Sequence, residues 1–159
     1  MNQTYLLIGG NVGNRSKNME RAAELIGAKV GAVGKQSALY ETEAWGKKDQ
    51  PAFLNQVLKV DTDLSPEDLL QTILNIEQEM GRKRAEKYGP RTIDIDILLY
   101  NDLILDTKDL AIPHPQMHLR RFVLTPLAAI AASVIHPVLK KSIDELLLEC
   151  PDKLAVKKL

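Results

Sequence analysis

Cysteine is almost absent from this sequence: Cys150 is the only one among its 159 residues. A single cysteine excludes a disulfide within the chain, and it also excludes a cysteine-rich metal cage. Chains without disulfides are typical of reducing compartments, so we expect a cytoplasmic location.

Net charge and long apolar runs are missing as well. Lysine and arginine together number 21, as do aspartate and glutamate, so the formal net charge is zero and no whole-molecule field would attract nucleic acid or anionic lipid. The N-terminus has no basic leader followed by a signal-length apolar run. The most apolar later stretch, residues 122–135, contains Pro126 and is too short to span a bilayer. We therefore expect no nucleic-acid partner and no membrane partner, and any polyanion site must be local.

What is present fits one ordinary domain. At 159 residues with 45% hydrophobic composition, the chain can bury one core but is short for two. No linker or repeat interrupts it, so we predict a single domain over residues 1–159, as a monomer or weak homodimer.

Apolar runs and turn signals predict the order strand, helix, strand, strand, helix, strand. The expected strands cover residues 4–8, 36–42, 53–62 and 92–100. The first helix is capped by Asn14 or Ser16 and broken by Gly27 and Gly31. The second is capped by Ser65 and ends at Gly81. This order predicts an α+β fold with a ferredoxin-like antiparallel sheet and helices on one face.

The remainder of the chain reads as a C-terminal extension. We expect a short strand over residues 103–105, a turn at Pro113-His114-Pro115, and an apolar segment through Ala132. A last helix should be capped by Ser142 together with Glu145.

The clearest chemical signal is a pair of aspartates in the strand at 92–100. In Ile93-Asp94-Ile95-Asp96-Ile97 the period of two sends the isoleucines to the core and both aspartates to the opposite face. Alternate residues lie roughly 6.5 Å apart at Cα, so their oxygens can converge on one hard cation or bracket two. A solvated strand face explains the same alternation, and the pair alone leaves both readings open.

A run of cations immediately precedes this pair: Arg82, Lys83, Arg84, Lys87 and Arg91. Arginine binds phosphate oxygens bidentately, and Mg²⁺ binds carboxylate and phosphate oxygens together. The run and the aspartates together therefore predict a site for a magnesium-bound triphosphate. The run alone is equally typical of nucleic-acid contact or of a solvated loop. No Walker-type phosphate loop accompanies it, because residues 9–15 lack the required Lys-Ser/Thr.

Phe53 and Phe122 are the only phenylalanines, and both adjoin polar residues. Asn55 shares a strand face with Phe53, and Arg120 precedes Phe122. Two aromatic faces can clasp a flat heterocycle while an amide reads its edge, although core packing is the more ordinary role of phenylalanine.

Two further polar residues are singled out by their positions. His114 is held rigidly between two prolines and can donate to a phosphate or serve a structural role. Glu77 lies on the same side of its helix as Leu70 and Leu74, where it forms a polar contact at the helix edge or simply faces solvent.

The stretch Lys87-Tyr88-Gly89-Pro90-Arg91-Thr92-Ile93-Asp94-Ile95-Asp96-Ile97-Leu98 closely resembles the signature of the 6-hydroxymethyl-7,8-dihydropterin pyrophosphokinases, enzymes of folate biosynthesis. The similarity continues in order along nearly the whole chain, over Ile8-Gly9-Gly10-Asn11, Tyr40-Glu41-Thr42, Asp49-Gln50-Pro51 with Phe53-Leu54-Asn55, Gly81-Arg82-Lys83-Arg84, Pro113-His114-Pro115 and Arg120-Arg121-Phe122. That family transfers the pyrophosphoryl group of ATP to the hydroxymethyl oxygen of the pterin, releases AMP and uses two Mg²⁺ ions. The resemblance implies the same ATP-dependent reaction for this chain.

The resemblance also implies residue roles. Asp94 and Asp96 would be the metal ligands and, with Arg82 and Arg91, the catalytic residues. The pterin would be held by Thr42, Trp45, Gly46, Phe53, Asn55, Asp94 and Phe122. ATP would contact Glu77, Arg82, Arg84, Arg91, His114 and Arg120. Asp96 could also accept the hydroxyl proton, although a carboxylate bound to magnesium is a weak base.

Three positions depart from the family pattern. The loop after Thr42 usually carries proline but reads Glu43-Ala44-Trp45-Gly46 here, Tyr88 replaces a frequent tryptophan, and Leu74 replaces a polar residue that helps some members to hold nucleotide. The alternatives to this reading are a ferredoxin-like nucleic-acid-binding module that uses the Arg82 to Arg91 run, and another magnesium-dependent nucleotidyl or phosphoryl transferase.

Overall fold

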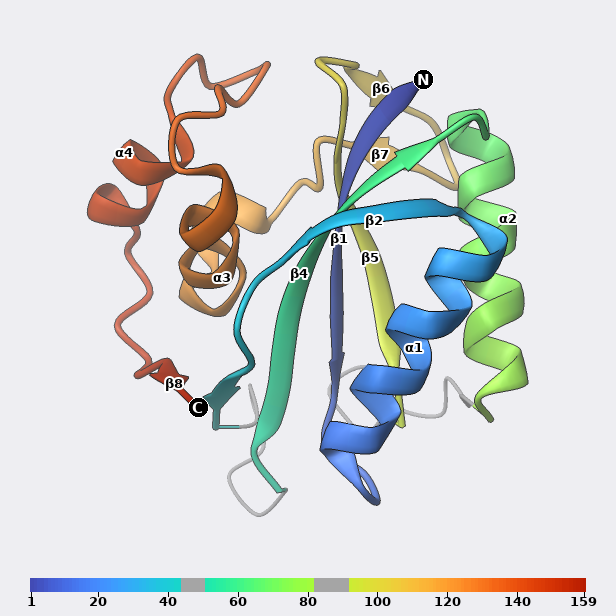
Figure 1. Cartoon of the computed structure of the whole chain (residues 1–159). Coiled ribbons are helices and arrows are strands. Elements are labelled where there is room, and N and C mark those ends of the chain that lie inside the picture. The colour runs from blue at the N-terminus through green and yellow to red at the C-terminus, as the bar shows by residue number, and fades with distance from the viewer. Residues whose placement is uncertain (44–50, 82–91) are drawn as a thin grey trace.

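Two long strands, β1 (Asn2–Gly10) and β4 (Phe53–Thr62), pair at the centre of an antiparallel sheet in the computed structural model (Figure 1). The structure describes residues 1–43, 51–81 and 92–159. On the other side of β1 lies β5 (Asp94–Tyr100). Along the outer side of β4 lie β2 (Gly31–Gln36) and then β3 (Tyr40–Thr42), and β8 (Lys157–Lys158) pairs with β3. The sheet order is β5-β1-β4-β3-β8, with β2 also on β4.

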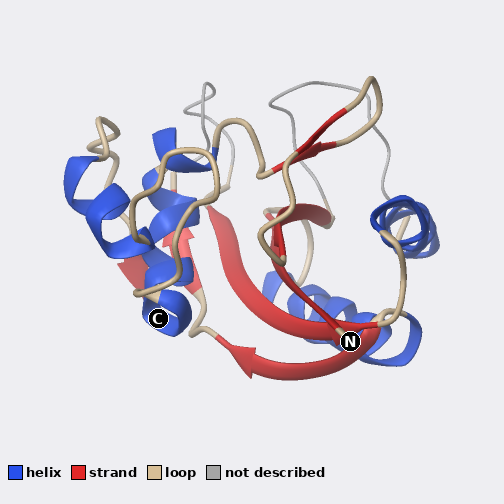
Figure 2. Ribbon diagram, turned by 90° about the horizontal axis from the view of Figure 1, so that it is seen from above, coloured by secondary structure: helices blue, strands red, loops and turns tan. Residues whose placement is uncertain are grey.

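Helices cover both faces of this sheet (Figure 2). On one face α1 (Arg15–Lys29) and α2 (Pro66–Glu79) pack against strand residues that include Leu6 and Ile8. On the other face α3 (Arg121–Ala131) and α4 (Ile143–Glu149) pack against the alternate residues, Tyr5 and Leu7 among them. The two helices of the expected core, α1 and α2, do share one face, whereas the C-terminal extension forms α3 and α4 and covers the second face.

Three helix starts confirm the caps expected from the sequence. The Asn14 side chain accepts from the backbone N–H of Lys17, so Asn14 and not Ser16 caps α1. Ser65 caps α2 in the same way. Ser142 and Glu145 form a reciprocal capping box at α4. An N-cap side chain stabilises its helix by about 1 kcal/mol through a bond to a residue two or three positions later, so the sequence around the helix start is enough to predict it.

Of the two glycines expected to break the first helix, Gly31 does so and Gly27 does not. Gly27 lies inside α1, where its cost of about 1 kcal/mol is tolerated beside the fully buried Ile26. Gly31 begins β2, and a Cβ atom there would stand 1.9 Å from the carbonyl oxygen of Asp61, so the close approach of β2 to β4 requires glycine.

Some expected strands have other bounds. The single strand over residues 36–42 is wrong, because the regular ladder is interrupted between β2 and β3: the Ser37 N–H still donates to the Val57 carbonyl, but the Val57 N–H donates to the Ser37 hydroxyl instead of to a backbone carbonyl. β5 begins at Asp94 instead of Thr92. The strand expected at 103–105 is β6 (Leu105–Asp106), which pairs with β7 (Ala111–Ile112) in a separate two-stranded sheet. A 3₁₀ helix, η1 (Met117–Leu119), leads into α3.

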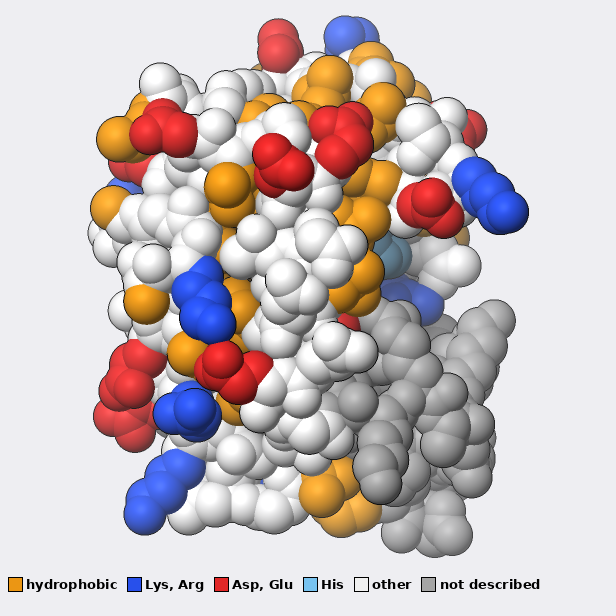
Figure 3. Space-filling model, turned by 90° about the vertical axis from the view of Figure 1, so that its right-hand side faces the viewer, with side chains coloured by type: hydrophobic (Ala, Val, Ile, Leu, Met, Phe, Trp, Pro, Cys, Tyr) orange, Lys and Arg blue, Asp and Glu red, His pale blue; other side chains and the backbone are white. Residues whose placement is uncertain are grey.

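The surface carries both signs of charge side by side. Acidic and basic side chains are interspersed on the face shown in Figure 3, in keeping with the zero net charge. In the described parts of the chain, no helix has both the length and the apolar composition that crossing a membrane requires.

Candidate active site

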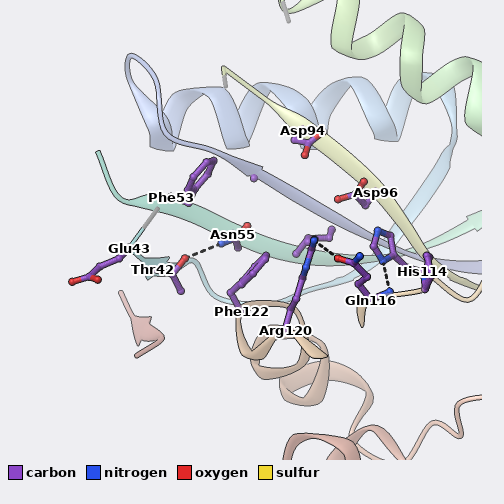
Figure 4. A pocket seen from close by; sticks show the side chains of 13 residues that line it. Thr42, Glu43, Phe53, Asn55, Asp94, Asp96, His114, Gln116, Arg120 and Phe122 are labelled. Atoms are coloured by element: carbon purple, nitrogen blue, oxygen red, sulfur yellow. Dashed lines mark hydrogen bonds between the residues drawn. The ribbon is translucent and has the colours of Figure 1, made fainter. Parts of the chain in front are cut away.

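A pocket of about 380 Å³ opens on the α3 face of the sheet (Figure 4). Its size falls in the range of small-molecule sites. The lining residues come from β1, β3, β4, β5, the turn before η1 and the start of α3: Leu7, Gly9, Thr42, Glu43, Phe53, Asn55, Asp94, Asp96, His114, Pro115, Gln116, Arg120 and Phe122.

Both aspartates of β5 face this pocket. Alternation along the strand buries Ile95 and Ile97 against α1 and α2 and leaves Asp94 and Asp96 half-buried on the pocket side, as the period of two predicts. Asp94 pairs across the sheet with Gly9, and Asp96 pairs with Leu7. The strand spacing thus presents two carboxylates to the same space.

Gly9 forms the floor of the pocket between the Asn55 amide and the Asp94 carboxylate. In the sheet register it lies opposite Asn55 of β4 on one side and opposite Asp94 of β5 on the other. A Cβ atom at Gly9 would stand 2.5 Å from the Asn55 Oδ1 atom, so a side chain would displace that amide. Because Gly9 has none, the floor stays flat between the amide and the carboxylate.

Asn55 is only 4% exposed, and its Nδ2 atom donates to the Thr42 hydroxyl at 3.4 Å. A buried amide that is held on one side keeps a fixed orientation and offers its remaining groups to a ligand. Glu43, whose position departs from the family pattern, also lines the pocket.

Phe53 and Phe122 reach the pocket from different elements, the start of β4 and the first turn of α3 (Figure 4). The Arg120 guanidinium carbon lies 5.8 Å from the centroid of the Phe122 ring, a distance at which cation and ring attract each other. Both phenylalanines are only partly buried, so each presents part of its ring to the cavity.

His114 is neutral at physiological pH. Burial lowers its pKa to about 4, the positive charge of Arg120 acts in the same direction, and the charge of Asp94 acts against them. Its Nδ1 atom accepts from the Gln116 backbone N–H at 3.2 Å, so the remaining proton lies on Nε2. The backbone of His114 is tied to β5 through the Leu98 carbonyl at 3.0 Å. His114 is thus a fixed, uncharged donor.

Glu77 lies outside the pocket lining, although the resemblance implied a nucleotide contact. It is 2% exposed, and its Oε2 atom accepts from the Ile95 N–H of β5 at 2.8 Å. Of the two readings of its sequence position, the surface residue is wrong and the polar contact at the helix edge is confirmed. Glu77 reaches the backbone between the two aspartates.

Several predicted site residues lie outside the described residues: Trp45, Gly46, Arg82, Arg84 and Arg91. The predicted residues that the structure brings together in the pocket are Thr42, Phe53, Asn55, Asp94, Asp96, His114, Arg120 and Phe122. Sequence reasoning missed Gly9 and Gln116. No local pattern in the sequence indicates either residue, because the registers of two strand pairs place Gly9 and the turn before η1 places Gln116.

The donor set fits a hard divalent cation that is shared with a ligand. Among the described residues, three or more histidine, cysteine, aspartate or glutamate side chains do not gather anywhere as a complete metal site. Mg²⁺ is commonly bound by one or two carboxylates and takes its other ligands from substrate phosphates and water. Asp94 and Asp96 match that pattern.

Comparison with known proteins gives a consistent family. Residues 5–132 match the family model described as 7,8-dihydro-6-hydroxymethylpterin-pyrophosphokinase (HPPK). The chain is 45% identical over 145 residues to the 2-amino-4-hydroxy-6-hydroxymethyldihydropteridine pyrophosphokinase of Aquifex aeolicus, covering 91% of this chain and 90% of that protein. It is 42% identical over 134 residues to the protein of the same name from Bacillus subtilis, covering 84% and 80%.

Other similar proteins are much longer. The chain is 41% identical over 150 residues to the folic acid synthesis protein fol1 of Schizosaccharomyces pombe. This match covers 94% of the chain but 20% of fol1. The crystal structure of Plasmodium falciparum HPPK-DHPS with SDX-DHP superposes with a TM-score of 0.76 at 21% identity, covering 94% of this chain and 43% of that one. The chain thus spans less than half of that solved protein, and at this identity the likeness shows the fold.

Proposed function

The chain belongs to the 7,8-dihydro-6-hydroxymethylpterin-pyrophosphokinase family and is an ATP-dependent enzyme of folate biosynthesis, and we propose that its pyrophosphoryl transfer takes place in the pocket of Figure 4. The substrates are ATP and 6-hydroxymethyl-7,8-dihydropterin, and the products are AMP and the pyrophosphorylated pterin. One observation carries the proposal: a single cavity joins an aromatic and amide end to an end that holds two carboxylates and two donors.

The aromatic and amide end would hold the pterin. Phe53 and Phe122 offer ring faces to a flat heterocycle, and the fixed Asn55 amide offers a donor and an acceptor to its edge. Thr42 and Asp94 border the same floor at Gly9. The roles implied for Trp45 and Gly46 belong to this end by resemblance.

The other end would hold the triphosphate. Arg120 and the Nε2–H of His114 are donors suited to phosphate oxygens. Asp94 and Asp96 would hold two Mg²⁺ ions, which when bound supply electrostatic stabilisation of the charge that develops on the phosphate oxygens. Arg82, Arg84 and Arg91 would contact ATP by resemblance, with Arg82 and Arg91 in catalytic roles. For Glu77, burial and the bond to Ile95 support a role in holding β5.

In the proposed reaction the pterin hydroxymethyl oxygen forms a bond to the β-phosphorus, and the bond from that phosphorus to the oxygen bridging to the α-phosphate breaks, so AMP leaves. The hydroxyl proton goes to solvent or to Asp96. The work of the protein is to align the two substrates and to keep donors in place before the reaction, since phosphoryl transfer asks for little covalent chemistry from the protein.

We infer a ferredoxin-like frame, because β4 and β5 flank β1 and the β2/β3 segment lies outside β4. We also propose a single cytoplasmic domain over residues 1–159, as a monomer or weak homodimer. A nucleic-acid-binding module is not favoured.

Product identification tests this function. The protein is incubated with ATP, Mg²⁺ and the hydroxymethyl-dihydropterin, and the nucleotides are separated by chromatography. We expect AMP in equal amount with pyrophosphorylated pterin, and release that depends on the pterin. ADP or free pyrophosphate as the product would contradict the proposal and favour another magnesium-dependent transferase.

A further inference from the structure

Resting on the proposed function, we propose that Gln116 is a positioning residue that orients the Arg120 guanidinium toward the triphosphate without neutralising its charge. The Gln116 Oε1 atom accepts a hydrogen bond from the Arg120 Nη2 atom across the turn that η1 forms (Figure 4). The sequence alone does not predict this contact.

Two neighbours hold the guanidinium from different sides. The Gln116 amide oxygen holds one nitrogen, while the Phe122 ring lies 5.8 Å from the guanidinium carbon. Both neighbours line the same pocket as Arg120. An arginine side chain loses much rotamer freedom when it binds a ligand, so holding it in advance lowers the cost of binding a phosphate.

An amide suits this place better than a carboxylate. The pocket already contains the acidic side chains of Glu43, Asp94 and Asp96. A carboxylate at position 116 would form an ion pair with Arg120, offset its charge and repel a polyphosphate. An uncharged acceptor orients the guanidinium and leaves its full charge available to the ligand.

Gln116 acts on the two phosphate donors by separable routes. Its side chain contacts Arg120, whereas its backbone N–H donates to the Nδ1 atom of His114. Substitution of the side chain therefore removes the first contact and keeps the second. The role of the side chain can therefore be measured separately. Its substitution should change the binding of the nucleotide and not that of the pterin.

The test compares Gln116→Leu and Gln116→Glu with the wild-type protein. Steady-state kinetics are measured for ATP and for the pterin separately, and calorimetric titration with Mg-ATP is run without pterin. We expect Gln116→Leu to raise the KM for ATP about fivefold to tenfold, the size of one ordinary lost hydrogen bond, with the KM for pterin unchanged. Gln116→Glu should raise it at least as much, and its excess over Gln116→Leu should shrink in about 0.5 M salt, because that excess is electrostatic.

Gln71 offers a matched control on α2. Its side chain donates to the Asn75 side chain at 3.0 Å, another exposed glutamine contact four residues apart, but it lies outside the pocket lining. Gln71→Leu and Gln71→Glu should leave both KM values unchanged. An ATP KM within twofold of wild type in either Gln116 variant, or equal rises for both substrates, overturns the proposal. If the wild-type protein forms no AMP, the proposed function fails instead, and the calorimetric affinities for Mg-ATP still decide the role of Gln116.

Discussion

Replacing Gly9 by alanine should weaken pterin binding while leaving the protein folded. The new Cβ atom would stand 2.5 Å from the Asn55 Oδ1 atom and 3.1 Å from the Leu54 carbonyl oxygen. Ordinary contacts between such atoms need about 3.5 Å, so the Asn55 side chain must retreat by about 1 Å. Its hydrogen bond to Thr42 is already 3.4 Å long, so a retreat of this size breaks it.

Part of the cost falls on function because the clashing atom is the end of a side chain that can turn. The fold loses the hydrogen bond of the buried Asn55 amide and must shift the Leu54 carbonyl slightly, which the lower unfolded-state entropy of alanine offsets only in part, so the free energy of unfolding should fall by about 1–3 kcal/mol. A displaced amide loses one or two bonds to the pterin, each worth about 1 kcal/mol, so the KM for pterin should rise about 5-fold to 30-fold. The KM for ATP should stay within about twofold, because neither described phosphate donor, His114 or Arg120, is among the atoms nearest the new Cβ.

The assay measures initial rates against each substrate in turn, with urea unfolding of the same preparations. Gly34→Ala in β2 is the matched control, since a Cβ atom there meets nothing closer than the Lys59 carbonyl oxygen at 3.8 Å. It should leave both KM values unchanged. A Gly9→Ala variant with a normal KM for pterin would refute the view that the bare floor positions the Asn55 amide.

Asp94→Asn and Asp96→Asn should each lower turnover at least about 100-fold, measured as AMP release over a range of Mg²⁺ concentrations. Asp106→Asn, a change at an exposed residue of β6, should leave turnover unchanged. Full activity in either pocket variant would show that its aspartate does not bind the metal. His114 has its pKa lowered to about 4 from 6.5, so the folded state disfavours its protonation and the resulting stability is complete above pH 6.5 and falls as pH drops toward 4. Urea unfolding at pH 7 and pH 4 should show a loss of up to about 3 kcal/mol that His114→Gln lacks, and parallel curves for both proteins would contradict the neutral assignment. Glu77→Leu should destabilise the fold by about 1–3 kcal/mol by leaving the buried β5 N–H without its acceptor, while Glu77→Gln retains one. A Glu77→Gln protein of normal stability whose KM for ATP rises tenfold would instead indicate direct nucleotide contact.

Local signals predicted the elements whose limits are set by neighbours in sequence. β4 has the expected bounds, 53–62, because alternation begins after Pro51 and stops before the Ser65 cap. The α3 helix was missed, because its uniform apolar character and internal Pro126 hide a helical period, and its burial depends on the far face of β1 and β4. The break between β2 and β3 depends on Ser37 meeting Val57, a contact across the sheet that no local pattern encodes.

In the candidate site too, some residues could be predicted from local sequence patterns and others could not. Strand alternation and residue type paired Asp94 with Asp96 and Phe53 with Asn55, and the family resemblance joined the two pairs in one site, where the pocket brings them together. Gly9 could not be predicted, since its place between Asn55 and Asp94 follows from the registers of two strand pairs. The residue roles in catalysis and binding remain predictions, which the variants above test.

The pairing of β8 with β3 has a practical consequence for anyone handling this protein. Lys157 and Lys158 are bonded along β3, and the Leu159 N–H donates to the Leu39 carbonyl at 2.9 Å, immediately before the strand that ends at Thr42 in the pocket wall. A purification tag or a surface tether attached after Leu159 would pull on that wall. Met1 is 88% exposed and precedes β1 (Figure 1), whose pocket residues Leu7 and Gly9 lie toward the other end of the strand, so an anchor placed there would load a part of the sheet away from the pocket.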